Sequence, residues 1–287
     1  MKRIIFLTLI SGAILSCSKQ EIQDEQFTVE AGLPSQVSKT SLGGKVGNSW
    51  PLVWSEGDCL NLNGVLSSPL ASADAGASSA SFKFSGVGGS SVWNYTYCGV
   101  AGSDCTVVFP SSQDSNAGNI DLNSLPMYAS SASVSSITLL PLGAVLRFSF
   151  TSSSAVTLSQ IQLRAIGGES ICGDYTVGKN ASGLLNGVLT VAGNNRDNLL
   201  VSAGVALSSY PSAFCIVIPA GTYSAGFYAR IIASDGKIME VWFNTKSNKT
   251  LSEGTLYDFG EAAFVPMGTS IMTQMSTEQF AVDTIGY

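Results

Sequence analysis

The sequence feature that most constrains the fold is an alternation of apolar and polar residues with a period of two, repeated along the chain. This alternation is typical of a β-strand with one buried face, because successive side chains of a strand point to opposite sides of the sheet. It is clearest at 60–62, 82–84, 93–97, 146–150, 160–164 and 239–243. Two continuous apolar runs, at 215–218 and 226–232, predict more deeply buried strands.

Turn-forming residues separate these predicted strands at short intervals. Glycine stands beside Asn, Asp, Ser, Glu or a second Gly at 56–58, 63–64, 86–89, 167–168, 186–187, 234–236 and 252–254. No window combines a 3.6-residue period with helix caps. We therefore expect an all-β chain built from antiparallel β-sandwiches.

The chain is long enough for two such units. Its 287 residues favour about two domains at roughly 150 residues each. A stretch rich in Ser and Ala at 130–136, followed by Pro141-Leu142-Gly143, predicts a boundary near 130–142. We expect an N-terminal sandwich over 37–138, a C-terminal sandwich over 139–260 and a separate tail over 261–287.

The first residues have the pattern of a secretory signal peptide. Lys2 and Arg3 precede an apolar stretch over 4–15, which is shorter than the roughly 20 residues that a helix needs to cross a bilayer. The stretch ends in Ile14-Leu15-Ser16-Cys17, which resembles the lipobox of bacterial lipoproteins. That resemblance implies a signal peptide over 1–16, lipid on Cys17 and attachment to the outer membrane. The alternative is a plain secretory signal followed by a chance cysteine.

The residues that follow Cys17 predict a solvated tether. Glu21, Asp24, Glu25 and Glu30 make 17–36 acidic, and few large apolar groups interrupt it. No later stretch reaches 18 uninterrupted apolar residues, so we expect the lipid to be the membrane attachment.

Composition argues against several function classes. Histidine is absent, which removes Ser-His-Asp and Cys-His catalysis and His-ligated zinc. With 14 basic and 20 acidic residues, the net charge of −6 gives no basic surface for nucleic acid. Glu169 and Asp174 are the best candidates for paired carboxylates, but no further glycosidase signature accompanies them. We expect no enzyme activity, no cofactor and no metal.

Five cysteines remain after Cys17, and the odd number leaves at least one unpaired if all bonds are intramolecular. Cys98 and Cys105 are close enough in sequence to close across a turn, and the sequence leaves that pairing open. The other three lie in apolar runs and are expected to be buried thiols: Cys59, Cys172 and Cys215.

The tryptophans have two interpretations. They could stack on sugars if exposed, but packing in a core or at a sheet edge is the favoured role. The four residues concerned are Trp50, Trp54, Trp93 and Trp242.

Short motifs spread over 39–259 resemble, in order, those of the fimbrillin family. Lys39-Thr40-Ser41, followed by Trp54-Ser55-Glu56-Gly57-Asp58, is similar to the family's opening motif, in which a "KTS" segment precedes a "WxxGD" turn. Residues 218–227 are the clearest late match, and 251–257 resemble the closing strand. Weaker matches lie between them at 109–112, 125–129, 144–148 and 173–177.

The resemblance implies a lipoprotein of Bacteroidales-type (type V) pili with two tandem transthyretin-like β-sandwich domains. Such a chain would be a structural component or anchor of cell-surface fimbriae. In this family a protease removes the first strand of the N-terminal domain, and the vacated groove accepts a C-terminal segment of a neighbouring subunit. The expected partners are therefore other fimbrial subunits and the outer membrane, in support of adhesion.

The chain departs from the family at the processing position. The best-known subunits are cut after an Arg in the N-terminal region, whereas no Arg lies between Arg3 and Arg147 here. Lys39 and Lys45 are the candidate processing residues. A chain that keeps its first strand would be an anchor, a base subunit or a stand-alone surface adhesin that binds glycan or host protein.

The candidate donor strand lies in the tail over 261–287. Its best alternating piece contains Phe280, Val282 and Ile285, although the alternation breaks between the last two. The alternative is that this tail packs on its own domain.

Overall fold

The computed structural model describes residues 26–34, 49–50, 52–114, 120–134, 136–244, 248–267, 273–274 and 281–285. Within these ranges the regular elements are strands, apart from two short 3-10 turns at Ser72–Asp74 (η1) and Leu122–Ser124 (η2). Every segment that period two or a continuous apolar run predicted as a strand is one, so the all-β prediction is confirmed. No helix in the described part of the chain has the length and apolar character to span a bilayer.

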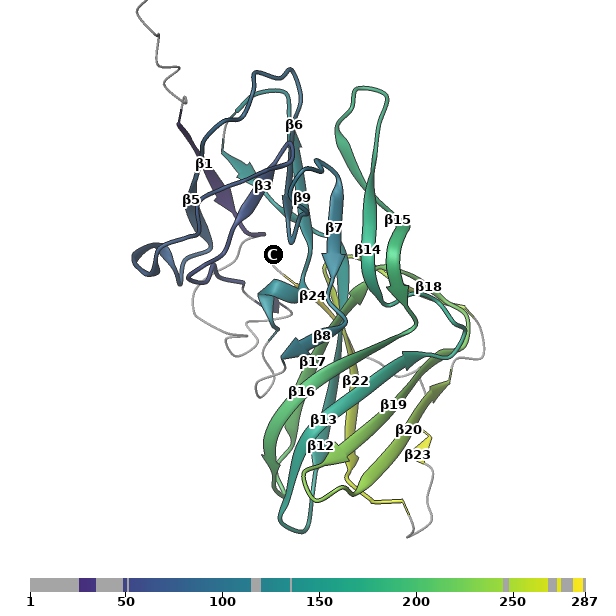
Figure 1. Cartoon of the computed structure of the whole chain (residues 1–287). Coiled ribbons are helices and arrows are strands. Elements are labelled where there is room, and N and C mark those ends of the chain that lie inside the picture. The colour runs from purple at the N-terminus through teal and green to yellow at the C-terminus, as the bar shows by residue number, and fades with distance from the viewer. Residues whose placement is uncertain are drawn as a thin grey trace, which may run out of the picture.

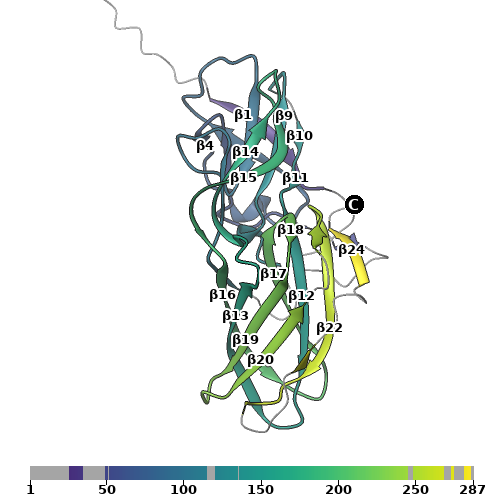
Figure 2. The same ribbon diagram turned by 90° about the vertical axis from the view of Figure 1, so that its right-hand side faces the viewer.

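Three sheets surround the first buried cluster, in the upper part of the molecule in Figures 1 and 2. The first has the order β10 (Ile137–Thr138), β1 (Phe27–Gly32), β5 (Ser79–Phe84). The second has the order β11 (Leu140–Pro141), β9 (Met127–Ser131), β6 (Trp93–Tyr97), β3 (Leu60–Leu62), β4 (Val65–Leu66). The third has the order β15 (Leu185–Arg196), β14 (Cys172–Lys179), β7 (Thr106–Phe109).

Two larger sheets enclose the second buried cluster. One has the order β17 (Ser212–Pro219), β12 (Gly143–Thr151), β22 (Thr255–Ala263), β24 (Ala281–Ile285), β2 (Ser49–Trp50). The other has the order β23 (Thr273–Gln274), β20 (Ile238–Asn244), β19 (Gly226–Ala233), β13 (Val156–Ala165), β16 (Asn198–Leu207), β8 (Ser112–Asp114). A small ribbon pairs β18 (Gly221–Tyr223) with β21 (Lys249–Leu251).

Aromatic rings from both large sheets fill this second cluster. Phe148 of β12 lies 4.9 Å from the ring centroid of Phe243 and 4.8 Å from that of Phe259. These three rings bring together β12 and β22 of one sheet with β20 of the other. Their burial and edge contacts hold the two layers face to face.

Strand β12 contributes to both clusters. Ala144, Leu146 and Phe148 pack in the second cluster, whereas Val145 packs in the first. On β17, Val217 likewise belongs to the first cluster. These strands are thus buried on both faces where the two clusters meet, which explains the continuous apolar run at 215–218.

Segments distant in sequence cross between the two parts of the molecule. The hairpin β14–β15 pairs with β7, so it completes the sheet beside the first cluster. In the opposite direction, β8 and β2 from the N-terminal half of the chain lie at the edges of the two large sheets. β8 pairs with β16, and β2 pairs with β24. The division into units over 37–138 and 139–260 stays a prediction, but the pairing links both ranges.

Strand β1 corrects part of the predicted tether. Phe27, Val29 and Ala31 alternate with polar residues, and β1 buries Val29 and Ala31 almost completely. The acidic composition of 17–36 concealed this short alternation, because Glu30 sits on the solvent-facing side of the strand. The tether prediction is therefore wrong for 27–32, and residues 17–25 lie outside the described part.

Strand β6 is buried on both faces, which its alternation did not predict. Its apolar face carries Trp93, Tyr95 and Tyr97, as expected, but Asn94 and Thr96 are buried as well. The Asn94 side chain donates to the carbonyl oxygen of Gly183 at 3.1 Å, in the turn that joins β14 to β15. The hairpin thus accepts a hydrogen bond from Asn94 on the polar face, whereas the buried Thr96 hydroxyl has no hydrogen-bond partner among the described residues.

The cysteines form no disulfide bond in the described part of the chain. Cys98 and Cys105, whose pairing the sequence left open, are both unpaired thiols. Cys172 and Cys215 are buried, as predicted, whereas Cys59 is only half-buried. Burial raises the pKa of the Cys215 thiol to about 12, so this side chain behaves as a small apolar residue.

Candidate functional site

The first part of the candidate site is the groove that holds β1, the first strand of the described chain. β1 lies between β5, with which it pairs antiparallel over six residues, and β10, with which it pairs parallel. Figure 1 shows β1 beside β5 at the outer edge of the upper part. A strand with two hydrogen-bonded neighbours leaves an open groove in the sheet when it departs.

Apolar side chains on the inner face of β1 fill that groove. Val29, Ala31 and Leu33 expose 1%, 0% and 2% of their surface. Phe27 is half-buried and stacks on Phe84 of β5, with 5.7 Å between the ring centroids. Fully burying a large apolar side chain contributes about 1.5–3 kcal/mol, so Val29 and Leu33 with the half-buried Phe27 together contribute roughly 4–8 kcal/mol.

Polar contacts fix the register of β1. The indole Nε1 of Trp54 donates to the Ala31 carbonyl oxygen at 3.1 Å, and both residues are buried. The Leu33 amide donates to the Ser78 carbonyl at 2.7 Å. The Trp54 ring also packs edge-on against Phe82 and Tyr97, so one side chain joins β1 to the centre of the first cluster.

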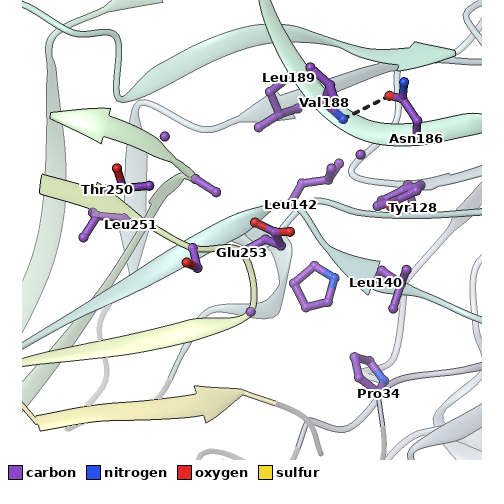
Figure 3. Close-up of a pocket in the computed structure, with 16 residues that line it drawn as sticks. Pro34, Tyr128, Leu140, Leu142, Asn186, Val188, Leu189, Thr250, Leu251 and Glu253 are labelled. Carbon is purple, nitrogen blue, oxygen red and sulfur yellow. Dashed lines mark hydrogen bonds between the residues drawn. The ribbon is translucent and has the colours of Figure 1, made fainter. Parts of the chain in front are cut away.

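A cavity of about 520 Å³ opens directly after β1, where the two parts of the molecule meet (Figure 3). Pro34 follows β1 and lines it, together with Tyr128 of β9 and Leu140 of β11. β15 contributes Asn186 and Val188, and the turn after β21 contributes Glu253. Sequence reasoning missed this cavity because its lining comes from segments that pair only in the tertiary structure.

The chemistry of this cavity is apolar with a single carboxylate. Leu140 and Val188 are 49% and 61% exposed, which is high for aliphatic side chains. Figure 3 shows the Glu253 carboxylate among the residues that line the cavity. Burial, and then the charge of Glu253, raises the pKa of Tyr128, so its hydroxyl stays protonated. Such a cavity can hold an apolar group, and the described side chains around it offer no nucleophile–base pair.

The candidate carboxylates at Glu169 and Asp174 have structural roles. Glu169 accepts hydrogen bonds from the amide and hydroxyl of Ser224 at 2.6 and 2.5 Å. Burial alone would raise the pKa of Glu169, but these hydrogen bonds lower it below its usual value. Asp174 accepts from the Asn194 side chain at 2.8 Å. Both carboxylates are held by neighbours as acceptors.

Most of the sequence-predicted site residues lie outside the described part of the chain. Cys17, Lys39, Lys45 and Phe280 are all in this group. The donor candidates that are described belong to β24, which pairs antiparallel with β22 and parallel with β2 in the same chain. The backbone of Val282 is opposite Tyr257, and that of Ile285 is opposite Trp50.

The tryptophans divide between the two interpretations. Trp54 and Trp93 are buried in the first cluster, so for them the packing role is confirmed. Trp242 is half-buried, and its ring centroid lies 4.4 Å from that of Tyr228. Only the backbone of Trp50 is described, as part of β2.

Comparisons with known proteins find similarity in structure alone. No family model matches the chain, and no curated protein sequence matches it. A candidate cell-adhesion protein from Bacteroides ovatus has 10% identity and a TM-score of 0.46, over 90% of this chain and 94% of that one. A tip fimbrial protein from Porphyromonas gingivalis with a C-terminal truncation has 11% identity and a TM-score of 0.42, over 90% and 99%.

A fimbrilin from Porphyromonas gingivalis has 9% identity and a TM-score of 0.34, over 91% of this chain and 97% of that one. These three solved structures are thus two fimbrial proteins and one candidate cell-adhesion protein.

Proposed function

We propose that this chain is a structural component or anchor of cell-surface fimbriae that assembles by β-strand exchange and supports adhesion. The observation that carries the proposal is the position of β1 in its groove. β1 is the first described strand, it has two neighbours in its sheet and an apolar inner face, and residues 35–48 connect it to the rest of the chain. The ordered fimbrillin motifs over 39–259 support the same role. In this proposal the chain has tandem transthyretin-like domains and is held at the outer membrane by lipid on Cys17.

The energetics of β1 are compatible with exchange. Loss of β1 exposes backbone groups of β5 and β10 together with an apolar groove, which is a binding site for another strand. A donor with comparable side chains regains the roughly 4–8 kcal/mol of apolar burial, less the cost of ordering the donor. Because the lost and gained contacts are of one kind, the exchange itself is nearly balanced in free energy. Cleavage favours it because the released β1 peptide is no longer tethered and can diffuse away.

Cleavage between β1 and β2 would release β1. Lys39 and Lys45 lie in the connecting segment and are the proposed processing residues, since no Arg lies between Arg3 and Arg147. A lysine-directed protease is therefore the proposed maturation enzyme. A copy of the chain that keeps β1 would serve as an anchor or base subunit.

The tail over 261–287 is the proposed donor. Its strand β24 pairs with β22 in the same chain, so it must leave that edge before it can enter a neighbour's groove. The short partner β2, with two residues, covers its other side. Removal of this tail is therefore expected to block assembly and to leave the groove intact.

A disulfide that locks β1 tests the proposal directly. Thr28 and Lys83 are exposed and opposite one another on β1 and β5. Opposite residues of an antiparallel pair have Cα atoms about 4.5–5.5 Å apart, which suits a disulfide. We expect the chain with Thr28→Cys and Lys83→Cys to remain monomeric after trypsin cleavage when oxidised, and to form SDS-resistant, heat-labile ladders when reduced.

A matched lock elsewhere controls for oxidation. Thr157 of β13 and Ala206 of β16 are also exposed and opposite one another, far from β1 in sequence and in the other part of the molecule. The oxidised chain with Thr157→Cys and Ala206→Cys should still form ladders. Ladders from the oxidised β1 lock, or their absence from every cleaved and reduced sample, would refute assembly through the β1 groove.

A second candidate function is that of a stand-alone surface adhesin that binds glycan or host protein. The paired rings of Tyr228 and Trp242 favour it, because both are only half-buried on the outer face of a sheet. A cleaved chain that stays monomeric and binds glycans would support this role over the fimbrial one.

A further inference from the structure

The outer face of the six-stranded sheet gathers arginines in an otherwise acidic chain. Three of the five arginines in the sequence, Arg164, Arg196 and Arg230, line one cavity of about 530 Å³. Figure 1 shows the strands that carry most of this cavity, β16, β13 and β19, side by side in the lower part of the molecule. The net charge of the whole chain is −6, so this cavity has the opposite sign of charge to the chain as a whole.

The strand register brings these side chains together. Arg164 of β13 is opposite Tyr228 of β19, and Gln162 is opposite Arg230. Because side chains alternate along a strand, these residues share the outer face while Leu163 between them is buried. Arg196 belongs to a different sheet: it is the last residue of β15, in the β14–β15 hairpin, and its side chain lines the same cavity.

The guanidinium groups retain unused donors. Arg164 Nε donates to Asp197 at 2.8 Å, which leaves its two terminal nitrogens. Arg230 Nε is buried without a hydrogen bond and lies 3.5 Å from a Glu240 carboxylate oxygen. The carboxylates of Asp197 and Glu240 thus neutralise two of the three guanidinium charges. The cluster keeps about one positive charge and several N–H groups without a hydrogen bond among the described residues.

An aromatic pair lies beside the arginines. Tyr228 lines the cavity, and Trp242 is its neighbour across the strand pair β19–β20, with ring planes 49° apart. Burial, followed by hydrogen bonding to Glu240, raises the pKa of Tyr228 to about 12, so its hydroxyl is neutral at physiological pH. Half-buried rings beside hydrogen-bond donors form the surface on which a sugar ring packs.

From this arrangement we infer that the cavity binds a glycan through a carboxylate-bearing sugar. Guanidinium donors pair with a carboxylate in a forked, charge-assisted geometry, which selects an acidic sugar over a neutral one. The side chains of Gln162 and Ser112 also line the cavity and can bond to sugar hydroxyls. A volume of about 530 Å³ is within the range of small-ligand sites and suits one or two sugar rings.

The cavity at the end of β1 has similar volume but the opposite chemistry. Its charged lining group is the carboxylate of Glu253, which repels an acidic sugar. The inference therefore assigns the ligand to the arginine cavity. It deepens the proposed adhesive role, but it does not rest on strand exchange, because the arginine cavity lies in a different sheet from β1.

Titration with defined oligosaccharides tests this assignment. The purified monomer is mixed with 3′-sialyllactose, digalacturonic acid or neutral lactose, and binding is measured by ligand-observed NMR and calorimetry. We expect at least one acidic sugar to bind at least tenfold more tightly than lactose. Arg196→Gln and Arg230→Gln should each weaken that binding tenfold or more and leave the thermal unfolding temperature unchanged within about 2 °C.

Lys237→Gln is the matched control, because Lys237 lies in the turn of the same β19–β20 hairpin and pairs with Asp235 outside the cavity. It should bind the acidic sugar as the parent does. Preference for one acidic sugar identifies a sialic or a uronic acid, and equal binding of both supports the wider class. Equal binding of lactose, absence of binding by both acidic sugars, or full affinity in both Arg variants overturns the inference.

The β1 lock separates this result from the proposed assembly. The oxidised chain with Thr28→Cys and Lys83→Cys cannot exchange β1 but keeps the arginine cavity, so it should bind the acidic sugar with unchanged affinity. Loss of ladders with retained binding supports both proposals. If the cleaved parent forms ladders, the oxidised lock forms none and the parent binds no acidic sugar, only the glycan assignment is overturned.

Discussion

Replacing Trp54 by Phe should loosen β1 more than it destabilises the rest of the first cluster. Trp54 is 1% exposed, and its Nε1 donates to the Ala31 carbonyl of β1 at 3.1 Å. Loss of the donor to a buried carbonyl costs about 1–3 kcal/mol. The edge contacts with Phe82 and Tyr97 weaken as the ring shrinks, which adds about 1 kcal/mol. We therefore expect Trp54→Phe to lower the free energy of unfolding by about 2–4 kcal/mol.

Hydrogen exchange locates this loss within the molecule. Because the missing hydrogen bond belongs to β1, the free energy for opening β1 should fall by the same 1–3 kcal/mol. That decrease corresponds to amide exchange about five- to 150-fold faster in 27–33, measured by mass spectrometry. Exchange through local opening of β13 and β19, whose buried side chains lie in the second cluster, should stay nearly unchanged.

Trp93→Phe provides the matched control. Trp93 is also buried in the first cluster, and its ring contacts Phe27 of β1 edge-on, with 6.1 Å between centroids. No hydrogen bond from its indole to β1 is found among the described residues. It should cost about 0.5–1.5 kcal/mol through lost ring contacts and leave β1 exchange within about threefold of the parent. If the two variants exchange β1 amides at the same rate, the indole–carbonyl bond does not hold the strand.

Three further changes test other parts of the structure. Gln113→Ala removes a side chain that donates to the Val217 carbonyl at 2.7 Å and accepts from its amide at 2.9 Å. Because two buried backbone groups lose their partners, the free energy of unfolding measured in urea should fall by about 2–6 kcal/mol. A decrease below about 1 kcal/mol would contradict this role. Burial raises the pKa of Asp58 in the folded state, so the stability that this carboxyl contributes is present below its unfolded pKa near 3.8 and is lost as the pH rises through the folded pKa. Asp58→Asn should therefore become progressively more stable relative to the parent as the pH rises through this range. A stability difference between the two proteins that does not change with pH would contradict this prediction. Cys17→Ala should abolish labelling by radioactive palmitate and release the chain from membranes, whereas unchanged membrane retention would exclude lipid at Cys17 as the anchor.

Local sequence pattern determined the strands of this protein. The strands predicted over 93–97, 146–150 and 160–164 lie within Trp93–Tyr97, Gly143–Thr151 and Val156–Ala165, because alternation, turn glycines and β-branched residues act over a few neighbouring positions. The same local signals, together with the absence of histidine, predicted an all-β chain without a histidine-dependent active site. Strand β1 shows the limit of this reasoning, because six residues of alternation were outweighed by the acidic composition around them.

Only the tertiary structure decided which strands lie next to one another. The pairing of β14 with β7, of β8 with β16 and of β24 with β22 joins segments far apart in sequence, and the sequence carries no local mark of such partners. The arginine cavity depends on the same step: Arg164, Arg196 and Arg230 come from three strands, and each looks like an ordinary surface residue in the sequence. The register of β13 and β19 sets Arg164 and Arg230 on one face, and the end of β15, from another sheet, adds Arg196 to the cavity. Periodicity reports which side of a strand is buried, whereas a binding site is made by the nonlocal hydrogen bonds and apolar packing that choose the neighbours.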